Sequence, residues 1–243
     1  MTPRLSSSCL AAGIVLIAAV LFAADNAGKG RLLLEEHFNA PTLPSTWTPG
    51  GRPNSFSIAD GALQASALPD DSHGPSIGVP LKGQNFTVTF RMKFTKPGYF
   101  LFLIDGETPF GEVDHLLRFV LTDSHAQLAQ DRGTLKSKMA QAKQRAKAGG
   151  KLVPGTKGQL ADPEFHRTEM LAKESTKIAG GGWHEVLIEQ RGNEVRAQVD
   201  DLLVLRGNGT VIDGKKSRIV FLIGNAGTVL VDDVRVWENE AEP

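Results

Sequence analysis

Cysteine is almost absent from the chain, whose 243 residues include a single one, Cys9. That residue lies in an N-terminal segment with the features of a cleavable signal peptide, so we expect the mature chain to contain no cysteine. It precedes the apolar run of the segment, whereas a lipoprotein acylation site would follow it. The absence excludes a disulfide framework, a thiol nucleophile and cysteine-ligated zinc or iron–sulfur sites. The apolar core alone must therefore hold the fold together.

An excess of charge of one sign is also lacking. Lys and Arg together number 27, and Asp and Glu together number 27. No overall field therefore favours nucleic acid or an anionic membrane. The sequence has no phosphate-binding glycine loop, no Ser-His-Asp signature, no nucleic-acid motif and no repeat of the length that a solenoid needs. We expect no nucleic-acid partner, and any electrostatic preference must come from a local patch.

The N-terminal apolar run, Leu10 to Phe22, is too short for a comfortable membrane span, which needs about 20 residues. Arg4 precedes this run, and Ala23 and Ala24 follow it. This order predicts a signal peptide over residues 1–23 and a secreted or periplasmic protein with no stable membrane span after cleavage. The alternative is an uncleaved membrane anchor.

Alternating side chains dominate the rest of the chain. In Asn85 to Thr95, apolar residues occupy every second position and polar residues the others. This period of two predicts a strand with one buried face. Tyr99 to Ile104 is nearly all apolar, as expected for a strand buried on both faces.

Turn signals divide these strands at intervals of about ten residues. Residues 60–61 read Asp-Gly, a strong hairpin signal. Near the end, the apolar parity shifts across residues 232–233, which predicts a β-bulge. The pattern predicts an all-β domain over residues 31–238, a two-sheet antiparallel sandwich or jelly roll.

One stretch, residues 131–182, departs from the strand pattern and is predicted to be a partly helical insertion. Residues 134–148 are rich in Ala, Gln, Lys and Arg and predict an exposed helix, and residues 164–173 a second, shorter one. Between residues 132 and 161 there are eight Lys or Arg and no acid. This basic stretch can bind an acidic polysaccharide, an anionic envelope component or a partner protein. It can equally be a solvated excursion without a partner.

Several stretches of the chain, in their order, resemble a bacterial exported domain, the 3-keto-disaccharide hydrolase domain, which is also grouped with family 16-like glycoside hydrolases. The resemblance covers residues 32–237 apart from the insertion. It implies a concanavalin-like two-sheet jelly roll whose concave face holds sugar, and a hydrolase that acts on glycosides oxidised at the sugar 3-position. The stretches are Leu34-Glu35-Glu36-His37-Phe38-Asn39, Trp47, Ser57-Ile58-Ala59-Asp60-Gly61-Ala62-Leu63, Gly182-Trp183-His184-Glu185-Val186-Leu187-Ile188-Glu189, Arg191-Gly192-Asn193-Glu194-Val195, Val199-Asp200-Asp201 and Val231-Asp232-Asp233-Val234-Arg235-Val236.

The candidate catalytic residues are Glu112, Asp114 and His115. The two acids lie on the same side of an extended chain, roughly 7 Å apart by strand rise, and half-resemble the Glu-x-Asp-x-Glu strand of family 16 enzymes. Residues 116 and 117 are both Leu, so the second catalytic glutamate is absent and a double displacement is not expected. His115 can serve as a general base or as a metal ligand. The alternative is a solvated acidic loop with an ordinary surface His–Asp pair.

The candidate substrate-binding residues are Arg91, Arg118, Asp105 and Trp47. Both arginines occupy the polar faces of predicted strands, where they can line a concave sheet and hydrogen-bond sugar hydroxyls or carboxylates. Asp105 belongs to the same acidic region as the catalytic candidates, and Trp47 can stack on a sugar ring. The alternative for the arginines is a solubilising outer face.

A metal site is the last candidate. Glu36 and Asp232 lie in the first and last predicted strands, which can bring them together around calcium, a cation that prefers oxygen ligands. Calcium or another divalent cation is therefore the one cofactor considered, and the alternative is ordinary polarity at a sheet edge.

These observations favour a secreted carbohydrate-active protein that binds or hydrolyses a glycoside or polysaccharide on a concave sheet. The alternative is a non-catalytic module that binds sugar or an anionic envelope component through its basic insertion. The sequence leaves open whether the protein is an enzyme.

Overall fold

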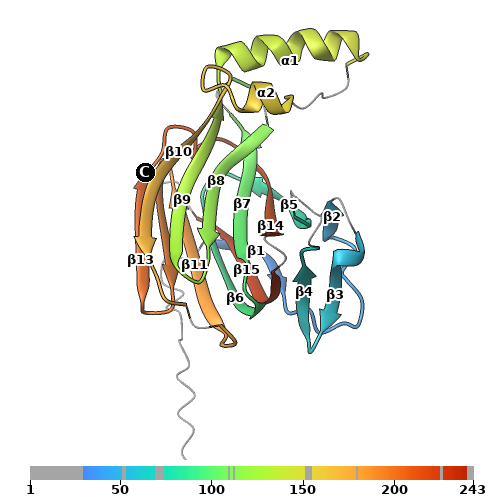
Figure 1. The fold of residues 1–243 in the computed structure, drawn as a ribbon, viewed down its shortest axis with the longest axis vertical. Coiled ribbons are helices and arrows are strands. Elements are labelled where there is room, and N and C mark those ends of the chain that lie inside the picture. The colour runs from blue at the N-terminus through green and yellow to red at the C-terminus, as the bar shows by residue number, and fades with distance from the viewer. Residues whose placement is uncertain are drawn as a thin grey trace, which may run out of the picture.

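The computed structural model describes residues 30–50, 53–68, 74–108, 110–111, 113–150, 155–178, 180–224 and 227–239. Within them, two antiparallel β-sheets pack face to face (Figure 1). The first sheet has eight strands in the order β13-β12-β11-β6-β15-β4-β3, with β1 also paired to β15. The second has seven, in the order β10-β9-β8-β7-β14-β5-β2. The predicted two-sheet antiparallel architecture is thereby confirmed.

The strands and helices have the following bounds. The first sheet contains β1 (Arg31–Glu36), β3 (Phe56–Ala59), β4 (Ala62–Ser66), β6 (Phe86–Lys96), β11 (His184–Arg191), β12 (Glu194–Val199), β13 (Leu203–Asn208) and β15 (Thr228–Glu238). The second contains β2 (Thr48–Gly50), β5 (Ser76–Gly83), β7 (Tyr99–Glu107), β8 (Val113–Leu121), β9 (His125–Gly133), β10 (His166–Ser175) and β14 (Lys216–Gly224). The helices are η1 (Pro53–Ser55), α1 (Leu135–Lys147) and α2 (Lys157–Leu160).

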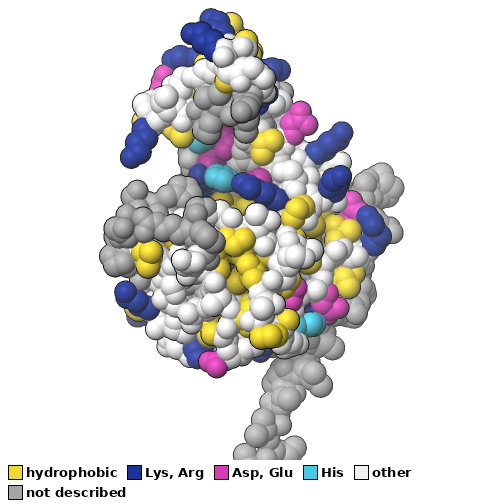
Figure 2. Space-filling model, turned by 90° about the vertical axis from the view of Figure 1, so that its right-hand side faces the viewer, with side chains coloured by type: hydrophobic (Ala, Val, Ile, Leu, Met, Phe, Trp, Pro, Cys, Tyr) yellow, Lys and Arg dark blue, Asp and Glu magenta, His cyan; other side chains and the backbone are white. Residues whose placement is uncertain are grey.

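The described residues between β9 and β10 form an arm, defined as residues 134–150 and 155–165, that carries α1 and α2 beyond one end of the sandwich (Figures 1 and 2). The predicted helix over residues 134–148 is confirmed. Thr134 is its N-cap and forms a capping box with Ser137, because the side-chain oxygen of each residue accepts a hydrogen bond from the other's backbone N–H. No helix among the described residues is long and apolar enough to cross a membrane.

The predicted second helix over residues 164–173 is wrong, because these residues enter strand β10. β10 pairs with β9 along its whole length, from His166 opposite Gly133 to Ser175 opposite His125. The ladder of backbone hydrogen bonds that β9 offers at the sheet edge outweighs the weak helix propensity of the polar segment. The insertion therefore shrinks to the arm, and Asp131, which the prediction placed in it, belongs to β9.

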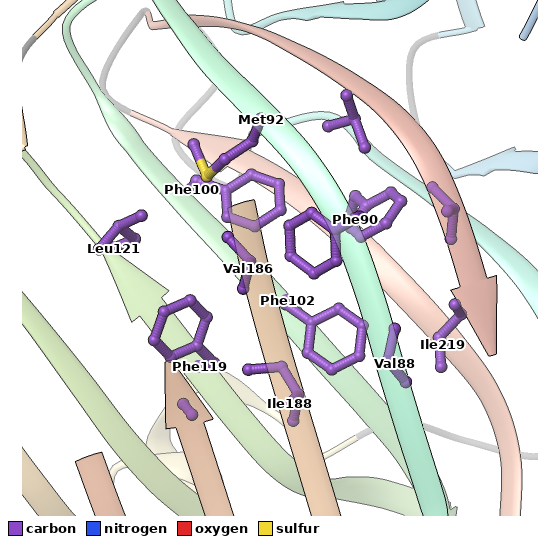
Figure 3. Packing of buried hydrophobic residues seen from close by; sticks show 14 of the residues in the cluster. Val88, Phe90, Met92, Phe100, Phe102, Phe119, Leu121, Val186, Ile188 and Ile219 are labelled. Carbon is purple, nitrogen blue, oxygen red and sulfur yellow. The ribbon is translucent and has the colours of Figure 1, made fainter. Parts of the chain in front are cut away.

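The core lies between the two sheets and is rich in phenylalanine. Phe90 of the first sheet contacts Phe100 and Phe102 of the second, with ring centroids 5.6 and 5.7 Å apart (Figure 3). Phe221 of β14 joins the same group and is fully buried. Because alternate residues of each strand face inward, the period-two pattern of β6 supplies one wall of this core.

Trp47 requires a correction, since it belongs to the core and cannot stack on a sugar. It is 2% exposed, and its ring packs on Phe38 at 5.4 Å and on Phe221 at 5.5 Å. A large aromatic ring that precedes a proline-rich turn is placed equally well at a binding surface or under the loop, so local sequence does not separate the two positions.

The predicted bulge at residues 232–233 is confirmed. The pairing of β15 with β6 shifts register between Asp232 and Arg235, and Asp233 has a positive φ of 51°. This conformation is uncommon for a residue with a Cβ, and it lets side chains on either side of the bulge face inward. Val231 and Val234 are accordingly both fully buried.

One buried charge fits its surroundings poorly. Lys216 begins β14 and is 4% exposed, and its Nζ has no hydrogen-bond partner among the described residues. Burial lowers the pKa of Lys216 to about 8, although the nearby Asp213 carboxylate acts in the opposite direction. The folded chain therefore disfavours the charged form of this amine.

We expect Lys216→Met to raise the free energy of unfolding by about 1–3 kcal/mol near neutral pH, because it removes an unpaired buried charge while keeping the volume. The wild-type protein should gain stability between pH 8 and 10.5, since the unfolded chain then holds a proton that the folded chain has lost. Urea unfolding of both proteins across this range checks the prediction. The exposed neighbour Lys215 supplies the control, Lys215→Met, and a Lys216→Met variant less stable than this control would contradict it.

Candidate functional site

The outer face of the second sheet carries a cluster of charged side chains drawn from five strands. We call it the polar row: Asp105 of β7, Asp114, His115 and Arg118 of β8, Asp131 of β9, His166 and Thr168 of β10, and Arg218 of β14. Strand pairing places Asp105 opposite both His115 and Arg218, and Thr168 opposite Asp131. Figure 2 shows a band of histidine and basic side chains below the arm, with an apolar area beneath the band.

Asp105 organises one half of the polar row. It is 2% exposed. One carboxylate oxygen lies 2.6 Å from Nδ1 of His115, and the other accepts a hydrogen bond from Nε of Arg218 at 2.5 Å. No described residue hydrogen-bonds Nε2 of His115, whose side chain is 31% exposed. A buried carboxylate thus fixes the ring through one nitrogen and leaves the other for a ligand, the arrangement of a general base.

Asp131 organises the other half. It is fully buried, and its carboxylate forms an ion pair with the Arg118 guanidinium. The hydroxyl of Thr168 donates to the same carboxylate at 2.5 Å. Nε2 of His166 lies 3.1 Å from Oδ2 of Asp114 beside this pair. A buried anion of this kind is tolerated only with a cation and a hydrogen-bond donor in contact, and Arg118 and Thr168 supply both.

The Asp114–His166 pair is polarised toward its charged form. Burial disfavours the Asp114 anion, but hydrogen bonds from His166 and from the backbone N–H of His115 outweigh it and lower the pKa of Asp114. The hydrogen bond to Asp114 raises the pKa of His166, against its own burial and with further help from the charge of Asp131. The ion pair therefore persists from below the usual Asp range to above the usual His range.

We expect NMR titration to find the pKa of His166 above its usual value of 6.5, and Asp114→Asn to bring it down. The stability that this histidine contributes is complete below pH 6.5 and is lost as the pH rises through its raised pKa. Asp123→Asn, at an exposed carboxylate in the turn after β8, is the control and should leave the titration unchanged. An unchanged titration in Asp114→Asn would refute the pairing.

The same region contains the one group of potential metal ligands found among the described residues. Ligand atoms of Asp114, Asp131 and His166 lie within 4.8 Å of one another. Two carboxylates and an imidazole suit a divalent cation such as zinc. However, the guanidinium of Arg118 already contacts the Asp131 carboxylate and takes the place of a cation. We therefore base no chemistry on a metal here.

An apolar floor adjoins the polar row on the same face. Leu101 and Leu103 of β7 lie beside Val220 and Leu222 of β14, and all four are at most 6% exposed. The strand predicted to be buried on both faces, residues 99–104, is confirmed by this floor, because its other side chains enter the core. Tyr99 is half-buried at its edge. Among the described residues of this apolar floor, only Tyr99 carries a polar side-chain atom.

The structure brings four of the predicted site residues together and separates others. Asp105, Asp114, His115 and Arg118 all belong to the polar row, whereas Glu112 lies outside the described residues. The row's remaining members are Asp131, His166, Thr168 and Arg218, which the sequence reasoning missed. The alternation of β14 was a usable signal for Arg218, because it shares a face with Val220 and Leu222.

Arg91 requires a correction. Arg91 lies on β6 in the first sheet, whereas Arg118 lies on β8 in the second. The two arginines are therefore on opposite outer faces of the sandwich. The Arg91 guanidinium pairs with Asp232 at 2.6 Å and Asp233 at 2.7 Å and lies 5.1 Å from the Trp183 ring. Alternation shows which face of a strand is outward, but it does not show to which sheet the strand belongs.

The suggested calcium ligands are each already paired within the chain. Glu36 accepts a hydrogen bond from the backbone N–H of Phe38 at 2.8 Å, and the Asp232 carboxylate is neutralised by Arg91. β1 and β15 do pair, with Glu36 opposite Val234. Glu36 and Asp232 belong to no group of three potential ligands among the described residues.

No family model matches the sequence, and neither does any curated protein sequence. Solved structures do match. LamAcat from Zobellia galactanivorans is 11% identical, with a TM-score of 0.58 over 88% of this chain and 100% of its own. The Bacillus licheniformis beta-glucanase is 10% identical, with a TM-score of 0.54 over 87% of this chain and 99% of its own.

The carbohydrate binding module CBM66 from Bacillus subtilis is 11% identical, with a TM-score of 0.51 over 82% of this chain and 100% of its own. Likenesses at such low identity bear on the fold alone. They confirm the concanavalin-like two-sheet jelly roll that the sequence resemblance implied.

Proposed function

We propose that the polar row binds a glycoside and that His115, oriented by Asp105, acts on it as a general base. The observation that carries the proposal is the 2.6 Å contact between Nδ1 of His115 and the buried Asp105 carboxylate, with Arg218 on its other oxygen. The names of the structural neighbours, a beta-glucanase and a carbohydrate binding module, are consistent with a sugar ligand on this fold.

A double displacement on an ordinary glycoside does not fit the strand that carries Asp114. That mechanism needs a second carboxyl group about 5–5.5 Å from the first. Leu116 and Leu117 stand two and three positions after Asp114, and both are fully buried. The nearby Asp131 carboxylate is also fully buried, and it is ion-paired with Arg118. A single base beside a charged row suits a reaction in which the substrate itself makes one proton acidic.

A glycoside that carries a ketone at C3 is such a substrate, because the carbonyl acidifies the proton on the neighbouring C2. In the proposed reaction His115 removes that proton and the C1–C2 double bond forms. The C1–O bond breaks, and the leaving alcohol takes the electron pair and a proton. Water then adds across the double bond to give the free keto sugar, so the sum is hydrolysis. Arg118 and Arg218 lie where they can hydrogen-bond the carbonyl and hydroxyl oxygens of the sugar.

The test compares a glycoside oxidised at C3 with two unoxidised substrates. A nitrophenyl 3-keto-glucoside should release nitrophenol with the protein, whereas nitrophenyl glucoside and laminarin should not be cleaved. In deuterium oxide the recovered keto sugar should carry deuterium at C2. Cleavage of the unoxidised substrates, or cleavage without label, would refute the base mechanism.

A sugar-binding module without turnover is the second candidate. It is favoured by the likeness to CBM66 and by the ion pairs that both arginines already form with buried carboxylates. Isothermal titration with laminarin fragments and with the 3-keto-glucoside separates the two candidates, because a module binds without releasing product.

We further propose that the protein is exported and works outside the cytoplasm, either secreted or periplasmic. The support is the order of charge, apolar run and small residues in residues 1–23. N-terminal sequencing of the protein recovered from the producing cell should begin near Ala24 or Asp25, and a retained Met1 would contradict cleavage.

A further inference from the structure

We propose that the outer face of α1 docks the protein on an anionic phospholipid surface. The proposal concerns the arm and is independent of the chemistry at the polar row. Figure 1 shows α1 lying across one end of the sandwich, and Figure 2 shows basic and hydrophobic side chains together at that outer end.

The helix carries an apolar stripe on its exposed side. Leu135, Met139, Ala142 and Ala146 recur at the spacing that places residues on one helix face. All four are exposed, Leu135 by 61% and Met139 by 54%. Exposed aliphatic side chains in a row, without a covering element among the described residues, are suited to contact an apolar phase.

Cations flank this stripe on both sides. At about 100° per residue, Lys143 and Lys147 fall on one border of the stripe and Lys138 and Arg145 on the other. None of the three lysines has an ion-pair partner among the described residues, and α1 contains no acid. An apolar strip between two rows of basic side chains is the pattern of a helix that lies in a membrane interface.

The opposite side of α1 is fixed to the body of the arm. Ser137 is 1% exposed. The Thr134 hydroxyl donates to the backbone oxygen of Glu164 at 2.5 Å, and on the flank of the helix Lys136 pairs with Asp162 at 2.7 Å. The helix is therefore presented in one orientation, and docking requires no refolding of the arm.

The stripe favours a lipid surface over an acidic polysaccharide. Lysines alone serve either partner, since both are anionic. Leu135 and Met139 contribute favourably to binding only where they leave water. They do so at the boundary between the headgroups and acyl chains of a bilayer. Leu160 of α2, which is 48% exposed, adds to the apolar surface of the same arm.

The test uses the processed protein and vesicles of phosphatidylglycerol and phosphatidylcholine in equal amounts, with pure phosphatidylcholine for comparison. We expect co-sedimentation with the anionic vesicles only, weakened by added salt. Lys143→Gln/Lys147→Gln should lower the vesicle affinity about 25-fold, at about fivefold for each lysine. Leu135→Ser/Met139→Ser should lower it about tenfold or more.

Leu202→Ser/Val204→Ser, at exposed apolar residues around the β12–β13 turn of the first sheet, is the matched control and should bind like the wild type. Equal binding to both vesicle types, or wild-type binding by either α1 variant, would overturn the proposal. Binding to dextran sulfate that is lost in the lysine variant, combined with vesicle binding that is unaffected by Leu135→Ser/Met139→Ser, would overturn it in favour of a polysaccharide partner.

Discussion

Replacing His115 by Gln is expected to lower kcat for the 3-keto-glucoside by about 10²–10⁴-fold, the range that a general base contributes. Glutamine keeps a polar side chain of similar length that can still contact Asp105, but it cannot accept a proton. The dissociation constant of the substrate should change little, because Arg118 and Arg218 still line the row. Stopped or continuous assays of nitrophenol release, together with calorimetric binding, measure both quantities.

The control for this variant is His125→Gln. His125 begins β9, and its ring contacts the Thr122 hydroxyl at 3.0 Å, outside the polar row. This variant should retain wild-type kcat. A His115→Gln protein with unchanged kcat would remove His115 as the base, and equal losses in both variants would indicate a general effect on folding.

Replacing Arg118 by Met should lower the free energy of unfolding by about 3 kcal/mol, because the fully buried Asp131 carboxylate then loses its cation. The methionine keeps much of the packing volume, so the loss reflects charge rather than a cavity. Thr168 still donates to the carboxylate but cannot neutralise it. Urea unfolding followed by circular dichroism measures the change.

A double variant makes the cause testable. Arg118→Met/Asp131→Asn removes both charges and keeps an acceptor for the Thr168 hydroxyl, so it should recover most of the lost stability. Arg167→Met, at an exposed arginine of the neighbouring β10, is the surface control and should stay within about 0.5 kcal/mol of wild type. A double variant as unstable as Arg118→Met would show that packing, rather than the unpaired anion, explains the loss.

The strands could be predicted because their signals are local. In β6 the alternation of Phe86 to Phe94 specifies one buried face, and the all-apolar residues 99–104 specify a strand covered on both sides. The α1 helix is equally local, since Thr134 caps it and its composition favours a helix. β10 could not be predicted in this way, because its strand state depends on pairing with β9.

In the candidate site, too, some residues could be predicted from local sequence, and others depend on how the strands pair. Asp105 and His115 are ten residues apart in neighbouring strands, so the sequence shows them as one cluster. Asp131 and Arg218 come from strands further along the chain and join the polar row only through the order of the second sheet. Arg91 and Arg118 look alike in sequence, and only the sheet assignment of β6 and β8 separates them.

The placement of β15 has a consequence for how the chain folds. This final strand lies inside the first sheet, with β6 on one side and both β1 and β4 on the other. Strand β1 can therefore pair only after β15 has been synthesised. Contacts between residues so far apart in sequence form slowly. The first sheet of a nascent chain therefore stays incomplete until residues 228–238 have been synthesised, and β1, β4 and β6 lack their shared neighbour until then.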